Sequence, residues 1–156
     1  GRSNVLAGGS VEAYCISHEL NFVLISDEPD ELEKDEKGIS MLARDAKIYK
    51  DTESLADMIF NLTKSYRSDY RATLARKTEE CVLMLADLIV AANLSAPTKR
   101  IEILGNDFVI AYERLQFLIR LALRQKQISL KQQAQVARLM DGIGKQATGW
   151  RKSAIK

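Results

Sequence analysis

The sequence predicts an all-α protein, an up-down-up-down four-helix bundle with a short acidic N-terminal extension of α/β-like pattern. Apolar residues recur at steps of three and four through four segments after about residue 52, which is the period of helices with one buried face. Short connections rich in turn residues join these segments, as in antiparallel bundles. Strand-like runs occur only before residue 51. We therefore expect an N-terminal extension over residues 1–46 and a bundle domain over residues 47–156.

The N-terminal extension combines short helical and strand-like signals. We expect a helix over residues 11–20, a buried strand over the apolar run 22–26 and a second helix that starts near Pro29. The segment KIYK at 47–50 is a candidate for a second strand. Because two short strands are marginally stable by themselves in water, this region needs the bundle, a partner chain or a missing part of its parent fold, or else it is mostly helical or flexible.

The first two bundle helices each have one apolar face. Asp51 or Thr52 is expected to cap the first helix, and the second is expected over about 71–94, after the linker 65–70. The positions predicted to face the core are Leu55, Ile59, Leu62, Tyr66, Leu74, Val82, Leu85, Ile89 and Ala92.

The third helix, expected over about 99–126, has the most regular apolar pattern. Pro97 marks where the preceding helix cannot continue, and Thr98 is expected to cap this one. Its predicted core positions follow steps of four and three: Leu104, Phe108, Ala111, Leu115, Leu118 and Ala122. Ile110, Phe117 and Leu121 widen the apolar surface, so the helix is expected to be covered on more than one side, by its bundle neighbours or by another subunit.

The fourth helix is expected over about 130–152. Ser129 and Gln132 have the spacing of a capping box. The predicted core positions are Val136, Met140, Ile143, Ala147 and Trp150, the last closing one end of the bundle. Gly142, Gly144 and Gly149 each disfavour a helix by roughly 1 kcal/mol relative to alanine; close approach of another helix explains them better than a frayed end.

The residue inventory excludes many enzyme classes. His18 is the single histidine, and Cys15 and Cys81 lie far apart, with Cys81 inside an apolar stripe, where it is expected to be buried. The chain has neither a phosphate-binding GxxxxGK[ST] loop nor a dinucleotide-binding glycine motif. We therefore expect no enzymatic activity, no catalytic residue, no cofactor and no metal. Without a long apolar run or an apolar leader, a cytoplasmic protein is expected.

The net charge of +2 conceals an asymmetry along the chain. Residues 1–57 carry six basic and 13 acidic side chains, a net charge of −7, whereas residues 58–156 carry 17 basic and eight acidic ones, a net charge of +9. A basic helical surface attracts nucleic acid. The plainer interpretation is that the acidic N-terminal part folds against the basic remainder of the same chain.

A line of cations on the fourth helix is the most specific functional signal. Four basic residues recur every seven positions and form a nearly straight row of ~30 Å along the helix: Lys131, Arg138, Lys145 and Lys152. Such a row can follow phosphates; a solvated helix face is the alternative. Arg151 adds to its far end. On the third helix, Arg114, Arg120 and Arg124, with Lys126, either contact nucleic acid or pair with acidic residues across a subunit interface.

Two other groups are weaker candidates. Arg67, Arg71, Arg76 and Lys77 alternate with Tyr66 and Tyr70, a mixture that can stack on unpaired bases, although Tyr66 is better explained as the edge of the core. In the extension, carboxylates that can hold a divalent cation for nuclease chemistry are Glu12, Asp27 and Glu28. Solvated turn carboxylates are far commoner than catalytic ones.

About two thirds of the chain, from about residue 47 to 156, resembles a bacterial four-helix-bundle family. YRATLARKTEE at 70–80 and MLADLIVAAN at 84–93 are similar to the family's second helix. The stretch 113–153, ERLQFLIRLALRQKQISLKQQAQVARLMDGIGKQATGWRKS, is similar to its third and fourth helices and the turn between them. The family includes the accessory variability determinant (Avd) proteins of diversity-generating retroelements and proteins encoded in intervening sequences of large-subunit ribosomal RNA genes.

The resemblance implies a bundle that assembles into a ring, commonly a pentamer, with a basic surface that binds RNA or DNA. It also implies a reverse transcriptase as partner and no catalytic activity of the bundle itself. Our leading hypothesis is therefore a homo-oligomeric nucleic-acid-binding accessory protein. The alternatives are a purely structural scaffold, in which the acidic arm docks on a neighbouring subunit, and a metal-dependent nuclease.

Overall fold

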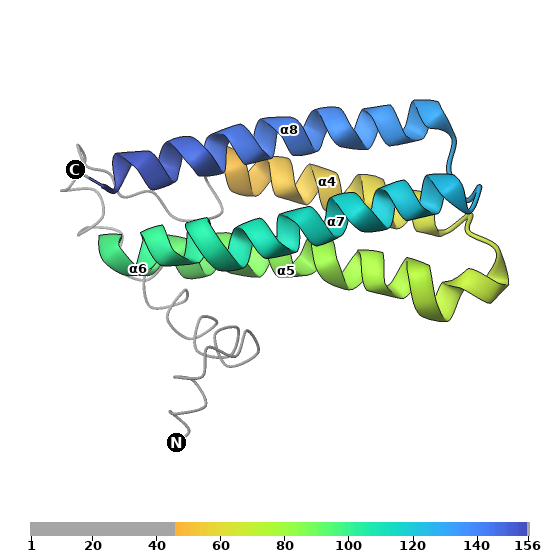
Figure 1. The fold of residues 1–156 in the computed structure, drawn as a ribbon, viewed down its shortest axis with the longest axis horizontal. Coiled ribbons are helices and arrows are strands. Elements are labelled where there is room, and N and C mark those ends of the chain that lie inside the picture. Colours follow the sequence, from red (N-terminus) through yellow and green to blue (C-terminus); the bar gives the residue numbers. More distant parts are fainter. Residues whose placement is uncertain (1–45, 156) are drawn as a thin grey trace, which may run out of the picture.

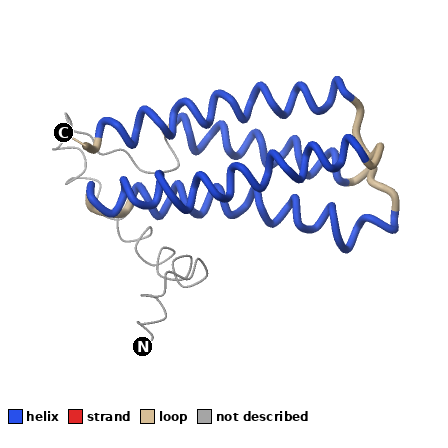
Figure 2. Tube along the Cα trace, in the orientation of Figure 1, coloured by secondary structure: helices blue, strands red, loops and turns tan. Residues whose placement is uncertain are grey.

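The computed structural model describes residues 46–155, and every regular element within that range is helical (Figure 2). The elements are α4 (Lys47–Thr63), a 3-10 turn (Ser68–Tyr70), a π-helical turn (Arg71–Ala75), α5 (Arg76–Asn93), α6 (Pro97–Glu102), a second π-helical turn (Ile103–Asp107), α7 (Phe108–Arg124) and α8 (Leu130–Ser153). Four long helical segments thus form a bundle, which confirms the all-helical prediction for the described residues. The helices and the strand expected within residues 1–45 lie outside them.

The helices surround one core in the order α4, α5, α7, α8, each packing on the next and α8 packing back on α4 (Figure 1). The turn that follows α4 and the turn between α7 and α8 meet at one end of the bundle. There the Arg67 backbone N–H donates to the Gln127 side-chain carbonyl at 2.8 Å, and the Tyr70 hydroxyl donates to Gln125 at 2.7 Å. These bonds hold two turns that are far apart in the sequence against each other.

Helix α4 begins earlier than the sequence predicts, at Lys47. The expected strand at 47–50 is therefore wrong, as is the expected cap at Asp51 or Thr52. Ile48 and Thr52 are both buried, on the same stripe as Leu55, and the Thr52 hydroxyl donates to the Ile48 carbonyl at 2.8 Å. A threonine that bonds back to the preceding turn belongs to a helix interior, so the apolar stripe continues one turn further towards the N-terminus.

The third long segment begins at Pro97, preceded by Ala96 as its N-cap. The expected cap at Thr98 is therefore wrong: Thr98 lies within the first helical turn. Proline suits this first position because its fixed φ matches the helix and no N–H is needed there. From Pro97 the chain continues without a break through the π-helical turn into α7.

All predicted core positions are buried except Trp150, which is half-buried against the core. The predicted capping box is confirmed, with the Ser129 hydroxyl accepting from the Gln132 N–H and the Gln132 side chain accepting from the Ser129 N–H. Trp150 is covered on one side by the guanidinium of Arg100, 5.6 Å from the ring centroid. Cys81 is buried, as predicted, with its thiol 3.2 Å from the Ala111 carbonyl.

Close approach of another helix is found at one of the three glycines of α8. At Gly144 an added Cβ would lie 2.8 Å from the Tyr112 hydroxyl, whereas Gly142 and Gly149 face open space. The packing explanation therefore holds for Gly144 and is wrong for the other two. No helix among the described residues is long and apolar enough to cross a membrane.

Candidate nucleic-acid interface

The row of cations predicted on α8 lies on the outer face of that helix. Lys131, Arg138, Lys145 and Lys152 are all exposed, because the opposite side of α8 carries the buried Val136, Met140, Ile143 and Ala147. We call these four cations the α8 line. At ~1.5 Å of rise per residue, it spans ~30 Å.

One member of the α8 line has an internal partner. Lys145 Nζ lies 3.1 Å from Asp141 Oδ2, and both side chains are largely exposed. An exposed pair one helical turn apart contributes at most a few tenths of a kcal/mol, about 0.3–0.5 kcal/mol. A phosphate can therefore compete with Asp141 for Lys145.

Arg151 is turned away from the α8 line, towards the start of the third long segment. Its Cδ and guanidinium lie 3.3–3.4 Å from the position that a Cβ on Gly105 would occupy. A Cβ at this position would be in tight contact with the arginine, which would have to move by a few tenths of an ångström. Arg151 therefore belongs to the groove between α7 and α8, and Lys152 alone ends the exposed row.

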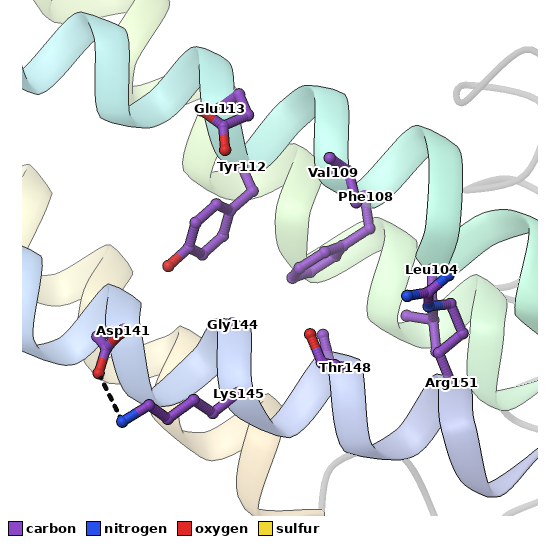
Figure 3. Close-up of a pocket in the computed structure, with 11 residues that line it drawn as sticks. Leu104, Phe108, Val109, Tyr112, Glu113, Asp141, Gly144, Lys145, Thr148 and Arg151 are labelled. Atoms are coloured by element: carbon purple, nitrogen blue, oxygen red, sulfur yellow. Dashed lines mark ion pairs between the residues drawn. The ribbon is translucent and has the colours of Figure 1, made fainter.

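That groove has a volume of about 400 Å³ and is open along one side (Figure 3). Leu104, Phe108 and Val109 form its apolar wall, with Thr148 and Arg151 on the α8 side. The sequence does not reveal this groove, because each of its residues follows an ordinary amphipathic pattern and only the tertiary packing brings them together.

Tyr112 lines the end of the groove nearest to Asp141 (Figure 3). Its hydroxyl donates to the Met140 carbonyl at 2.7 Å. Burial, and then the negative charges of Asp141 and Glu113, raise the pKa of Tyr112 above its ordinary value. The phenol is therefore protonated at neutral pH and acts there as a hydrogen-bond donor.

The three arginines of α7 are exposed, and two of them lie near different neighbouring helices. Arg120 faces α8, where it lines a small cavity of about 70 Å³ with Gln133 and Ala137. Arg114 lies on the α5 side, close enough that its charge partly opposes the burial that raises the pKa of Cys81 to about 11. The structure therefore brings Arg120 beside the α8 line and separates Arg114 from it.

The positive charge of the bundle is concentrated on two of its helices. Residues 108–155, which contain α7 and α8, carry nine basic side chains and only two acidic ones, Glu113 and Asp141. Residues 47–93, which contain α4 and α5, carry seven of each sign. The positive surface therefore belongs to α7 and α8.

The tyrosine and arginine group near residue 70 mainly shapes the turn after α4. Arg71 donates to the carbonyls of Tyr66 and Lys64, and Arg67 pairs with Asp69 at 2.9 Å. Tyr66 is 2% exposed, and burial, with a contribution from Glu79, raises the pKa of Tyr66 to about 12. It therefore lies at the edge of the core, as the favoured interpretation predicts, and presents no face on which a base can stack.

Among residues 46–155, no cluster of three or more histidine, cysteine or acidic side chains is arranged to hold a metal ion. The candidate nuclease carboxylates Glu12, Asp27 and Glu28 lie outside the described residues. The hypothesis of a metal-dependent nuclease therefore gains no support from the bundle.

A protein-family model described as bAvd-like matches residues 47–154, which is well over half of the chain. The match covers all four long helical segments. No curated protein and no solved structure matches the chain.

Proposed function

The chain belongs to the bAvd-like family, and on that premise we propose that it is a non-catalytic accessory protein that binds nucleic acid. The binding surface is the basic outer side of α8 and the adjoining part of α7. The bound element is the phosphate backbone, so binding depends little on base sequence, because contacts to phosphates carry no direct sequence information.

The α8 line is the observation that carries this proposal. Four exposed cations on one helix face match an extended polyanion better than a compact ligand, because a small anion engages only one or two of them. Only Asp141 interrupts the row. Arg120 adds a cation from α7 beside the row, whereas Arg151 lies in the groove between α7 and α8 and does not extend the row.

The family resemblance extends the proposal to assembly and partners. We propose a cytoplasmic, homo-oligomeric ring, a pentamer by resemblance, that assists the reverse transcriptase of a diversity-generating retroelement and holds its RNA or cDNA. The short turns between neighbouring helices support the up-down-up-down order that this assembly assumes. The exposed Ile110 and Phe117 support burial against another copy.

The same exposed apolar side chains favour a second candidate, a purely structural oligomeric scaffold. In that case the acidic residues of the N-terminal extension dock on the basic surface of a neighbouring copy, and nucleic acid has no role. The scaffold predicts that the oligomer dissociates when residues 1–46 are deleted. The accessory-protein proposal predicts that the same deletion leaves the oligomer intact and increases affinity for nucleic acid.

The direct test is the affinity of the full chain for single-stranded RNA, single-stranded DNA and duplex DNA at several salt concentrations. We expect binding to all three at low salt. The logarithm of the affinity should fall linearly as the logarithm of the salt concentration rises. Absence of binding at low salt would remove the proposal and leave the scaffold.

A further inference from the structure

The outer side of α7 is unusually apolar for a solvent-facing surface. Ile110 is 65% exposed and Phe117 is 50% exposed. Arg124 continues the same row at seven-residue spacing, and Arg114 with the half-buried Leu121 forms a second row beside it. We call these five residues the α7 outer face. It combines apolar side chains with two arginines, while Glu113, one turn from Ile110 and Phe117, is the one carboxylate on α7 beside it. Within the described residues neither arginine pairs with a carboxylate within 4 Å.

A second apolar patch lies on the outer side of α4 and α5. The Thr63 hydroxyl donates to Glu79 at 2.6 Å and fixes the register of these two helices. Phe60 lies one helical turn before Thr63, and Leu83 lies one helical turn after Glu79. The two side chains are 36% and 48% exposed. Because the helices run side by side, both side chains lie at about the same level along the bundle.

Acidic side chains surround this second patch. Asp57 lies three residues before Phe60, and Glu80 and Asp87 flank Leu83 on α5. The pKa of Tyr49 is raised by burial and then by Glu53 and Asp87, which places both carboxylates on the same side of the bundle. We call the six residues Glu53, Asp57, Phe60, Glu80, Leu83 and Asp87 the α4–α5 face. Cations lie at both ends of this face: Lys50, one turn before Glu53, at one end, and Lys64 and Arg76, beside the turn, at the other.

The two faces complement each other in charge and share an apolar centre. We propose that the α7 outer face of one copy of the chain packs against the α4–α5 face of a second copy. Ile110 and Phe117 then cover Phe60 and Leu83, while Arg114 and Arg124 oppose the carboxylates. This inference rests on the homo-oligomer of the proposed function, and it names the surfaces that form it.

The geometry has two consequences. The two faces differ, so the contact is heterologous, and repeated copies form a closed ring or an open filament and not a symmetric dimer. Neither face includes α8, so the α8 line stays accessible to phosphates in the assembly. Arg114 and Arg124 are thereby assigned to the subunit interface and not to nucleic acid.

The test measures the molar mass of the full chain in solution by light scattering, together with its helical circular dichroism. Phe117→Asp changes an exposed residue, so the fold should persist while the mass falls to that of one chain. The pair Arg114→Glu with Arg124→Glu should weaken assembly at least tenfold, and so should the pair Glu80→Lys with Asp87→Lys. When all four substitutions are made in one chain, the charges of both faces are inverted and attract each other again. This variant should therefore recover the assembly.

The pair Arg138→Glu with Lys145→Glu is the matched control, because it makes the same charge change on α8. It should leave the assembly intact and weaken nucleic-acid binding. If this pair leaves nucleic-acid binding unchanged, the proposed function fails and the interface stands.

Three results would overturn the interface. The first is a wild-type chain that remains a single chain at every concentration, which means that a different protein covers these faces. The second is assembly that survives Phe117→Asp. The third is assembly that depends on the α7 arginines but ignores Glu80→Lys with Asp87→Lys, which indicates a symmetric contact between two α7 helices.

Discussion

The ring of Tyr112 on α7 lies directly across Gly144 on α8. A Cβ added at Gly144 would meet the Tyr112 hydroxyl at 2.8 Å and the ring carbon that bears it at 3.1 Å. The same hydroxyl donates to the Met140 carbonyl, one turn earlier on α8. This contact sets the spacing of α7 and α8 beside the groove (Figure 3).

Substitution of Gly144 by alanine should therefore destabilise the bundle. The ring must move and its hydrogen bond must lengthen, for which overpacking costs of about 1–3 kcal/mol are typical. Urea unfolding followed by circular dichroism measures the change. Gly142→Ala and Gly149→Ala are the controls, because an added methyl meets nothing within 4 Å, and each should stabilise the helix by up to about 1 kcal/mol. Equal shifts for all three variants would contradict this account.

Two hydroxyl residues that resemble caps in the sequence should respond differently to alanine. Ser129→Ala removes the side-chain acceptor of the α8 capping box and should cost about 1 kcal/mol. Thr98→Ala lies inside the first turn of α6, where Ala96 is the cap, and should change stability by less than about 0.5 kcal/mol. Thermal unfolding of both variants checks the difference, and a larger loss for Thr98→Ala would mean that the helix begins elsewhere.

Tyr66→Phe should leave the bundle as stable as the wild type, or stabilise it by up to about 1 kcal/mol. The Tyr66 hydroxyl is buried and has no hydrogen-bond partner among the described residues, and removal of an unpaired buried hydroxyl relieves its desolvation penalty. Denaturant unfolding at neutral pH measures the effect. A loss of more than about 1 kcal/mol would show that the hydroxyl is bonded.

The contact between Asp51 and α8 should make part of the stability depend on pH. The Lys47 ammonium and the Gln146 amide both donate to Asp51 Oδ2 at 2.7 Å, and the Lys47 bond is the main cause that holds the pKa of Asp51 below its ordinary value of 3.8. A lowered folded-state pKa stabilises the fold above the ordinary value, and this contribution disappears as the pH falls through the lowered one.

Asp51→Asn is the variant that tests this pH dependence. The wild type should be more stable at pH 7 by less than about 1 kcal/mol, because the Lys47 side chain of the ion pair is largely exposed. The difference should shrink as the pH falls below about 5. A difference that stays constant down to pH 2 would mean that the carboxylate charge contributes nothing.

The sequence predicts the interior of the bundle better than its helix starts. Leu115, Val136 and Ile143 follow from periodicity alone, because a buried helix face must repeat every three or four residues. The predicted caps at Thr52 and Thr98 are wrong because the sequence does not distinguish a threonine that caps a helix from one inside it. Only the Thr52 bond to Ile48 and the position of Pro97 distinguish the two roles.

The candidate site is predictable in part for a similar reason. The α8 line follows from seven-residue spacing, which keeps side chains on one face of any helix. Arg114 and Arg120 look equivalent in the sequence, yet Arg114 lies close enough to Cys81 on α5 to affect the pKa of its thiol, whereas Arg120 lines a cavity between α7 and α8. The packing of the bundle, and not the local sequence pattern, determines which helix lies on each side of α7. For the same reason the sequence did not reveal the groove beside Tyr112.

The most direct measurement of the central claim is the salt dependence of RNA affinity for Lys131→Glu with Arg138→Glu and Lys145→Glu. We predict weaker binding than wild type and a slope of log affinity against log salt that is smaller by roughly two to three, because three phosphate contacts are lost. The control is Lys50→Glu with Lys64→Glu and Lys77→Glu, the same charge change on exposed positions of α4, α5 and the turn between them, which should keep most of the slope. Equal losses in both variants, or an unchanged slope in the first, would contradict the assignment of phosphate binding to the α8 line.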